Sequence, residues 1–72
     1  MEITQFKLRG EYIALCDLLK ITGVADSGGQ AKHIISGGEV TVDGQPEMRK
    51  AAKIRANQMV RCLGRSIEIV AA

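Results

Sequence analysis

The sequence is poor in aromatic residues and proline. Its 72 residues include one Tyr, one Phe, one Pro and no Trp. No apolar run approaches the roughly 20 residues that cross a bilayer, and the opening MEITQFKLRG holds no apolar signal region. A chain of this length buries only about 60% of its unfolded surface, which leaves room for one core. We therefore expect a single domain over residues 1–72, located in the cytoplasm and without a membrane partner.

Residues that build metal sites and catalytic groups are also few. Cys16 and Cys62 are far apart in the sequence and lack CxxC or Cys/His ligand spacing. His33 is the only histidine, and no Ser or Cys pairs with it in a recognisable nucleophile motif. We therefore expect no metal, no cofactor and no enzymatic activity. Both cysteines are expected to be reduced and buried, and His33 to lie on a solvated helix face.

Charge is nearly balanced overall but unevenly distributed. The net charge is +2 at pH 7, yet residues 49–67 hold six bases and no acid. Such a block repels itself unless an anion shares it, so it is a candidate footprint for nucleic acid. On charge alone, a solvated hairpin face explains it at least as well. The six bases are Arg49, Lys50, Lys53, Arg55, Arg61 and Arg65.

Residues 12–21 have the pattern of a first helix. Their apolar side chains recur at spacings of three and four, which predicts one buried stripe. Gly23 ends the helix, because glycine tolerates the left-handed conformation that follows a helix terminus. We expect Tyr12, like Phe6, to lie in the core. The stripe consists of Tyr12, Leu15, Cys16, Leu18 and Leu19.

Residues 27–30 read Ser-Gly-Gly-Gln, the spacing of a capping box. In that motif the serine oxygen accepts a backbone N–H of the first turn and the glutamine side chain reaches back. The spacing predicts a second helix that begins at Ser27 and ends at Gly37-Gly38. Together the two helices resemble a helix-turn-helix pair. One face of the second helix holds Ala31, Ile34 and Ile35, and the other holds Gly29, Lys32, His33 and Ser36.

The remaining segments predict a small sheet. Asp43-Gly44 is a strong turn dipeptide, and Pro46 places residues 45–48 at an edge or outside the sheet. Residues 48–54 lead into a turn at 55–58. The predicted architecture is α+β, with two helices packed on a small, mostly antiparallel sheet. Apolar and polar residues predict strands at residues 3–9, 39–42, 59–63 and 66–70.

Gly28 and Gly29 admit two interpretations. Neither GxxxxGK[ST] nor GxGxxG spacing is present, which excludes a nucleotide-binding P-loop. The first turn of a helix nevertheless presents unpaired N–H groups that suit a backbone phosphate, and Lys32 would add a formal charge. Alternatively, the glycines only allow the two helices to approach closely. The sequence leaves both interpretations open.

The motif LxxLLxxTGxxxSGGQAKxxIxxGxVxVDG runs from Leu15 to Gly44 and is followed by Arg49-Lys50 and Lys53-Ile54. It resembles the ribosomal-protein S-four RNA-binding domain, and is most similar to that family's small stand-alone bacterial members of the YbcJ type. The resemblance covers residues 12 to about 70. It implies an alpha-L motif, in which a helix-turn-helix-like pair precedes a small sheet and binds structured RNA, such as ribosomal or transfer RNA.

The resemblance also implies which residues contact RNA. They come from the start of the second helix and from the basic segment after the Asp-Gly turn. Two departures from larger family members remove expected phosphate contacts, since those members often carry an arginine where Gly28 stands and RKR where this chain has Arg49-Lys50-Ala51. The implied RNA-binding residues are Ser27, Gly28, Gly29, Gln30, Lys32, Arg49, Lys50 and Lys53.

The expected function is therefore a monomeric module that binds structured RNA through backbone phosphates. Single-strand binders stack bases on exposed aromatic side chains, and a core placement of Phe6 and Tyr12 leaves none. The alternative is a protein-interaction module whose basic face docks an acidic partner, for example during ribosome assembly. A steep salt dependence of RNA affinity distinguishes the first hypothesis from the second.

Overall fold

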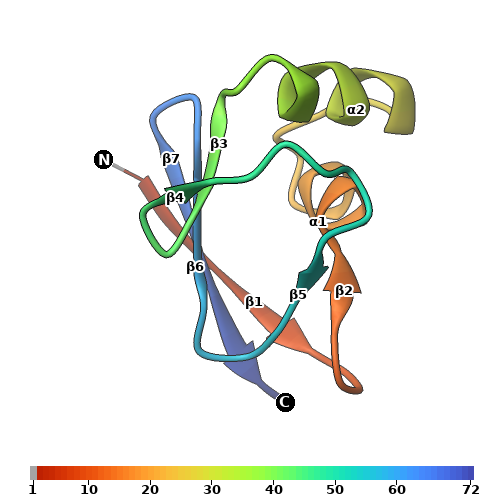
Figure 1. The fold of residues 1–72 in the computed structure, drawn as a ribbon. Helices are drawn as coiled ribbons and strands as arrows, with labels where there is room; N and C mark the ends of the chain where they lie inside the picture. Colours follow the sequence, from red (N-terminus) through yellow and green to blue (C-terminus); the bar gives the residue numbers. More distant parts are fainter. Residues whose placement is uncertain (1) are drawn as a thin grey trace.

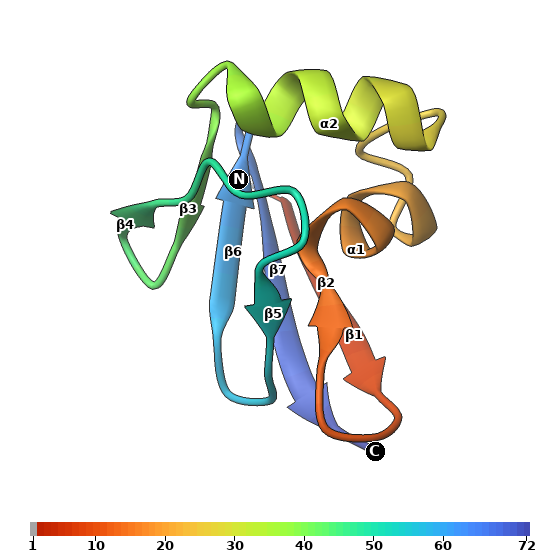
Figure 2. The ribbon, with the colours of Figure 1, turned by 45° about the vertical axis from the view of Figure 1, so that its right-hand side comes forward.

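The structure of the chain is a computed structural model that describes residues 2–72. Met1, the first residue of the expected domain, lies outside the described residues. Figure 1 shows the course of the chain, and Figure 2 shows α2 across the top of the view with α1 below it. The elements are β1 Glu2–Leu8, β2 Ile13–Ala14, α1 Leu15–Ile21, α2 Gly28–Ser36, β3 Val40–Val42, β4 Gln45–Pro46, β5 Lys53–Ile54, β6 Met59–Cys62 and β7 Arg65–Ala71.

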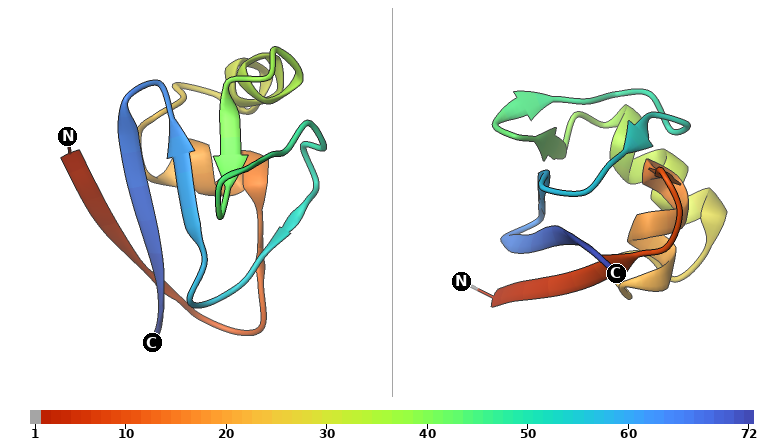
Figure 3. Two further views of the ribbon diagram at one scale, coloured as in Figure 1. Left: turned by 60° about the vertical axis from the view of Figure 1, so that its left-hand side comes forward. Right: turned by 90° about the horizontal axis from the view of Figure 1, so that it is seen from below.

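The strands form one large sheet and one small one. The large sheet has five strands in the order β1-β7-β6-β3-β4, and β2 pairs with β5 in a separate two-stranded sheet. The β1–β7 pair is parallel and the other pairs are antiparallel. Figure 3 shows both helices on one side of the large sheet. The predicted α+β architecture with a mostly antiparallel sheet is confirmed.

The core fills the space between that side of the sheet and the helices. α1 contributes Leu15, Leu18 and Leu19, each with no exposed surface. Full burial of such side chains stabilises the fold by about 1.5–3 kcal/mol each. The sheet contributes alternate residues of its strands, as the period-two pattern requires. The other fully buried large side chains are Ile35, Val40, Ile54, Val60, Ile67 and Ile69.

The second helix and the turns confirm their sequence predictions. Ser27 is the N-cap of α2 and Gly37 its C-cap. Asp43 and Gly44 have φ values of 51° and 82° and join β3 to β4, which is an edge strand as predicted from Pro46. The strands predicted at residues 59–63 and 66–70 form the antiparallel pair β6–β7. In this chain, local signals therefore identify α2 and the hairpin turns correctly.

The first helix begins later than predicted. Ile13 and Ala14 are extended and pair with Ile54 and Lys53, so α1 starts only at Leu15. The prediction that Tyr12 lies in the core is wrong. The residue comes just before β2, and its side chain is 46% exposed. Phe6 packs against the core as expected. The error arises because β5 was not predicted as a strand, and its pairing overrides the helical pattern.

The cysteines differ in burial. Both are free thiols in the structure, and Cys62 is 3% exposed within the core. Cys16 is half-buried and packs against the core from the first turn of α1. No helix within residues 2–72 is both long and apolar enough to cross a membrane.

Candidate nucleic-acid interface

The basic segment, residues 49–55, follows β4 and is anchored to the start of α1. The N–H of Leu15 donates to the Ala52 carbonyl at 2.9 Å, and the N–H of Cys16 donates to the Lys50 carbonyl at 3.0 Å. The first N–H groups of a helix lack partners within the helix, and the α1 N-cap residue Ala14 supplies no side-chain cap. The loop carbonyls replace that cap. The backbone is thus fixed beside α1 while the Lys50 side chain stays exposed.

β5 extends this anchoring to the residues after the loop. Lys53 pairs with Ala14 and Ile54 with Ile13 in the antiparallel ladder. Ile54 is only 1% exposed, and side chains alternate between the two faces of a strand. Lys53 and Arg55, its two neighbours, are both exposed to solvent. The alternation therefore turns two cations outward from a firmly paired strand.

A hollow of about 460 Å³ lies within the basic segment. Arg49, Ala51, Ala52 and Lys53 line it. The alanine side chains are too short to fill the space, and the only charged groups among the lining residues are cations. This lining suits an anionic group such as a phosphate, which a lysine binds as a point charge and an arginine can bind with two N–H groups.

Arg49 already has an anionic partner. Its Nε lies 3.2 Å from Oε2 of Glu47 and its Nη2 lies 3.2 Å from Oε1, so the pair is bidentate. The Arg49 guanidinium lowers the pKa of Glu47, and the Glu47 carboxylate raises the pKa of Arg49. By contrast, Lys32 and Lys50 form no side-chain hydrogen bond or ion pair with any residue between 2 and 72. An external anion must compete with Glu47 for Arg49 but meets no such competitor at these two lysines.

The start of α2 has the capping geometry that its sequence predicts. Ser27 Oγ accepts the N–H of Gln30 at 3.1 Å, and Gln30 Oε1 accepts the N–H of Asp26. The Ser27 and Gln30 side chains are therefore occupied in shaping the helix start. The N–H groups of Gly28 and Gly29 have no acceptor within residues 2–72.

The structure argues against one of the two interpretations of these glycines. A Cβ atom added at Gly28 would meet nothing within 4 Å, and one added at Gly29 would meet only Ser27 Oγ at 3.9 Å. Close approach of the two helices therefore does not require glycine at either position. Both residues lie on open surface, where the lack of a side chain leaves their N–H groups accessible.

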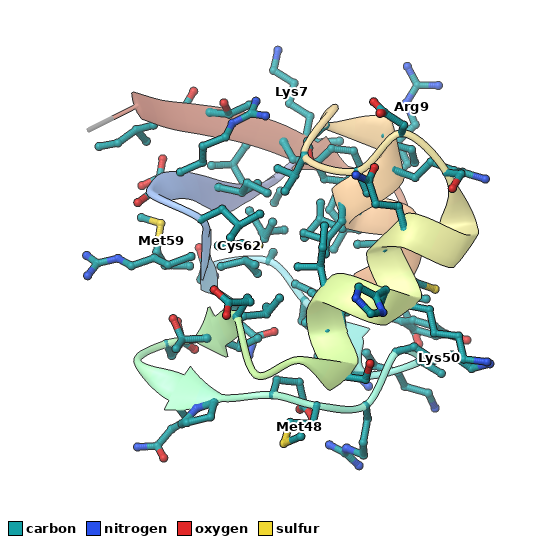
Figure 4. All side chains as sticks on the ribbon, turned by 90° about the horizontal axis from the view of Figure 1, so that it is seen from above. Lys7, Arg9, Met48, Lys50, Met59 and Cys62 are labelled. Carbon is teal, nitrogen blue, oxygen red and sulfur yellow. The ribbon has the colours of Figure 1, made fainter. Side chains whose placement is uncertain are left out.

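Lys50 and α2 lie on the same part of the molecule. Figure 4, which looks down on α2, shows Met48 and Lys50 along one side of the helix. In the same view Lys7 and Arg9 project from the far side, near β1. Lys32 and His33 belong to the exposed residues of α2. The candidate surface is thus made by α2 and the segment from Arg49 to Arg55.

The block of six bases does not form one surface. Arg61 lies on β6, where it pairs with Thr41 of β3 and Ser66 of β7. Arg65 is half-buried and its Nη2 donates to the Thr22 carbonyl at 3.3 Å. Only the first four bases of the block therefore belong to the segment beside α1.

Tyr12 and Arg55 lie beside the expected site residue Lys53 but were not themselves predicted as site residues. The ammonium of Lys53 lies 5.0 Å from the centroid of the Tyr12 ring, and Cζ of Arg55 lies 5.9 Å from it. A period-two interpretation of Lys53-Ile54-Arg55 would have placed both cations on one face. Tyr12 had no comparable signal, because its spacing to Leu15 and Leu19 matches a helix.

These features place the chain in a known family. The S4 domain family matches residues 6–70, and the chain belongs to it. Among its relatives, YbcJ of Escherichia coli (strain K12) is 50% identical over 60 residues, which are 83% of this chain and 86% of YbcJ. YbcJ of Shigella flexneri matches with the same identity and coverage.

A solved structure supports the same assignment. The solution structure of YbcJ from E. coli, described as revealing an alfaL motif involved in RNA-binding, is similar to this structure with a TM-score of 0.68. The match is 44% identical and covers 99% of this chain and 89% of that one. The predicted family resemblance and the alpha-L fold are therefore confirmed.

Proposed function

We propose that this chain is an RNA-binding module that contacts the backbone phosphates of structured RNA. The contacts come from Lys32 on α2 and from Arg49, Lys50 and Lys53. The main support for this proposal is the anchoring of the basic segment. Hydrogen bonds of 2.9 Å and 3.0 Å hold its backbone against α1 while its exposed cations face solvent. Such contacts fix orientation on a nucleic acid without reading its sequence.

The family assignment supports RNA as the ligand. S4 domain membership and the motif described for YbcJ both point to the same class of partner. The chain shares 44% identity with the solved YbcJ over nearly its whole length, which supports a common binding surface. We propose that the ligand is a folded cellular RNA such as ribosomal or transfer RNA, bound by a monomer in the cytoplasm.

The glycine-rich helix start has a supporting role in this proposal. The free N–H groups of Gly28 and Gly29 would donate to a phosphate oxygen, aided by the partial positive charge of the helix N-terminus. Ser27 and Gln30 would act by holding those N–H groups in position, because their own side chains are engaged in the cap. No reaction is assigned to these residues.

Folded RNA is preferred over an extended strand in this proposal, although Tyr12 does not lie in the core as expected. Tyr12 is exposed, so the chain does offer one aromatic ring. Proteins that bind single strands stack successive bases on several rings, which one ring cannot do. A-form helices are recognised mainly through shape, phosphates and 2′-hydroxyls, which suits a surface of exposed cations.

The test compares two exposed lysines on different sides of the molecule. Lys50→Ala should weaken binding of a labelled hairpin RNA several-fold, because loss of one phosphate contact removes part of the electrostatic term. Lys7→Ala removes the same charge near β1 and should leave affinity close to that of the unmodified chain. Equal weakening by both substitutions would reduce the effect to net charge. Absence of any RNA binding would favour an acidic protein as the partner.

A further inference from the structure

Tyr12 is an exposed aromatic residue with no role in the core. Its side chain is 46% exposed, and it is the only tyrosine in a chain that has no tryptophan. Phe6 is half-buried against the core. Tyr12 immediately precedes β2, whose pairing with β5 fixes the local backbone. The ring is therefore held at a defined place on the surface.

The strand pairing explains why two cations surround this ring. Ile13 pairs with Ile54, and continuing the antiparallel register by one residue places Tyr12 opposite Arg55. Lys53 is then the diagonal neighbour, which long side chains can also reach. The separations from the ring centroid, 5.0 Å to Lys53 Nζ and 5.9 Å to Arg55 Cζ, are those of cation–π contacts.

An aromatic ring beside two cations has the chemistry to bind a nucleotide. The ring offers a π face on which a base can stack, and the cations can neutralise the attached phosphate. Lys53 also lines the hollow in the basic segment, so the ring is continuous with the proposed phosphate-binding surface. The Arg55 backbone is held as well, because its N–H donates to Gln58 Oε1 at 2.7 Å.

We propose that Tyr12, Lys53 and Arg55 form a binding site for one unpaired nucleotide of the bound RNA. The base stacks on Tyr12, and a cation displaced from the ring face remains close enough to bind that nucleotide's phosphate. A single ring accepts a single base, so the ligand is a bulged or flipped-out nucleotide beside a helix rather than an extended strand. This inference rests on the proposed function and adds to it a preference for helices that carry an unpaired base.

A purely structural role makes different predictions. If the cation–π contacts only stabilise the β2–β5 pair, replacing Tyr12 should lower the melting temperature and leave RNA discrimination unchanged. A nucleotide site requires that discrimination depend on the aromatic ring. Tyr12→Phe keeps the ring, whereas Tyr12→Leu keeps apolar bulk and removes the π face, so the two variants separate these roles.

The experiment uses three labelled hairpin RNAs with the same stem. One has a single bulged adenosine, one has an abasic residue at the bulge, and one is fully paired. The unmodified chain should bind the bulged hairpin at least about fivefold more tightly than the abasic one, as expected for stacking of one base. Tyr12→Phe should retain this preference and Tyr12→Leu should lose it. Arg55→Gln should weaken binding to the bulged hairpin, while the matched Arg61→Gln, on another strand, should not.

The emission of the protein provides a second readout that needs no variant. Tyr12 is the sole source of tyrosine emission in the chain, so stacking of the adenosine should quench it. Fluorescence anisotropy of the labelled RNA measures binding independently. Binding without quenching, or equal affinity of the unmodified chain for the bulged and abasic hairpins, would overturn the nucleotide site and leave phosphate binding intact. Absence of binding to all three hairpins would overturn both proposals.

Discussion

At the scale of single residues, the pairing of Arg49 with Glu47 distinguishes this cation from its neighbours. Both guanidinium contacts to the carboxylate measure 3.2 Å, and the Arg49 side chain is 81% exposed. Exposed ion pairs contribute little to stability. Arg49 lowers the pKa of Glu47, whose carboxylate is charged at neutral pH in any case, so the pair is present under the conditions in which RNA binds. Glu47 therefore acts as an internal competitor for a phosphate.

Replacing Glu47 should release this competition. Glu47→Gln removes the negative charge with little change of shape, and RNA affinity at low salt should rise by roughly two- to fivefold, the value of an exposed ion pair. The increase should vanish when Arg49→Ala is already present, since no guanidinium is then left to release. Affinity measured by anisotropy for the four members of this double-mutant cycle checks the prediction. An equal gain in the Arg49→Ala background would mean that Glu47 acts only through net charge.

The two thiols should differ in reactivity. Burial raises the pKa of Cys62, and Glu39 raises it further, so little thiolate forms near neutral pH. Cys16 is half-buried and should react faster with a thiol reagent in the native protein. Timed labelling followed by mass spectrometry of peptides gives the order. Labelling of Cys62 before Cys16 without denaturant would contradict the placement of Cys62 in the core.

At the scale of elements, the β3–β4 turn is a structural feature separate from the basic loop. Gly44 has φ of 82°, and Asp43 links the turn to β6 through hydrogen bonds of 2.8 Å and 2.9 Å to the backbone of Met59. Gly44→Val should destabilise the fold by about 1–3 kcal/mol, because a β-branched residue is strained at this φ. Arg49→Ala should change stability by less than about 0.5 kcal/mol. Chemical denaturation of both variants tests this, and a larger loss for Arg49→Ala would show that the loop is structural.

The elements also show what local sequence can predict. α2 was predicted correctly because its cap, its apolar face and its terminal glycines all lie within the helix and its ends. The start of α1 was not, because Ile13 and Ala14 pair with a strand about forty residues away. The anchoring of the basic loop could not be predicted either, since it uses backbone carbonyls of Lys50 and Ala52, which any residue would supply. The exposure of Tyr12 follows from the same distant pairing.

At the scale of the whole molecule, the fold brings part of the basic block together with other residues on one candidate surface. The block of bases divides, so that Arg61 and Arg65 lie on the large sheet while the earlier bases follow the edge of α1. The pairing of β2 with β5 adds Tyr12 to that edge. Lys32 contributes from the exposed face of α2. The central claim is that this surface binds RNA phosphates.

The salt dependence of RNA affinity tests that claim most directly. Each phosphate neutralised releases counterions, so log K for a hairpin RNA should fall linearly with log salt, with a total slope of roughly −2 to −4. Lys32→Ala, Lys50→Ala and Lys53→Ala should each reduce the slope by about one, Arg49→Ala by less because of Glu47, and His33→Ala should have little effect. An unstructured pyrimidine strand should bind more weakly than the hairpin. A slope that none of the lysine substitutions changes would place the RNA-binding surface elsewhere on the molecule and contradict the account.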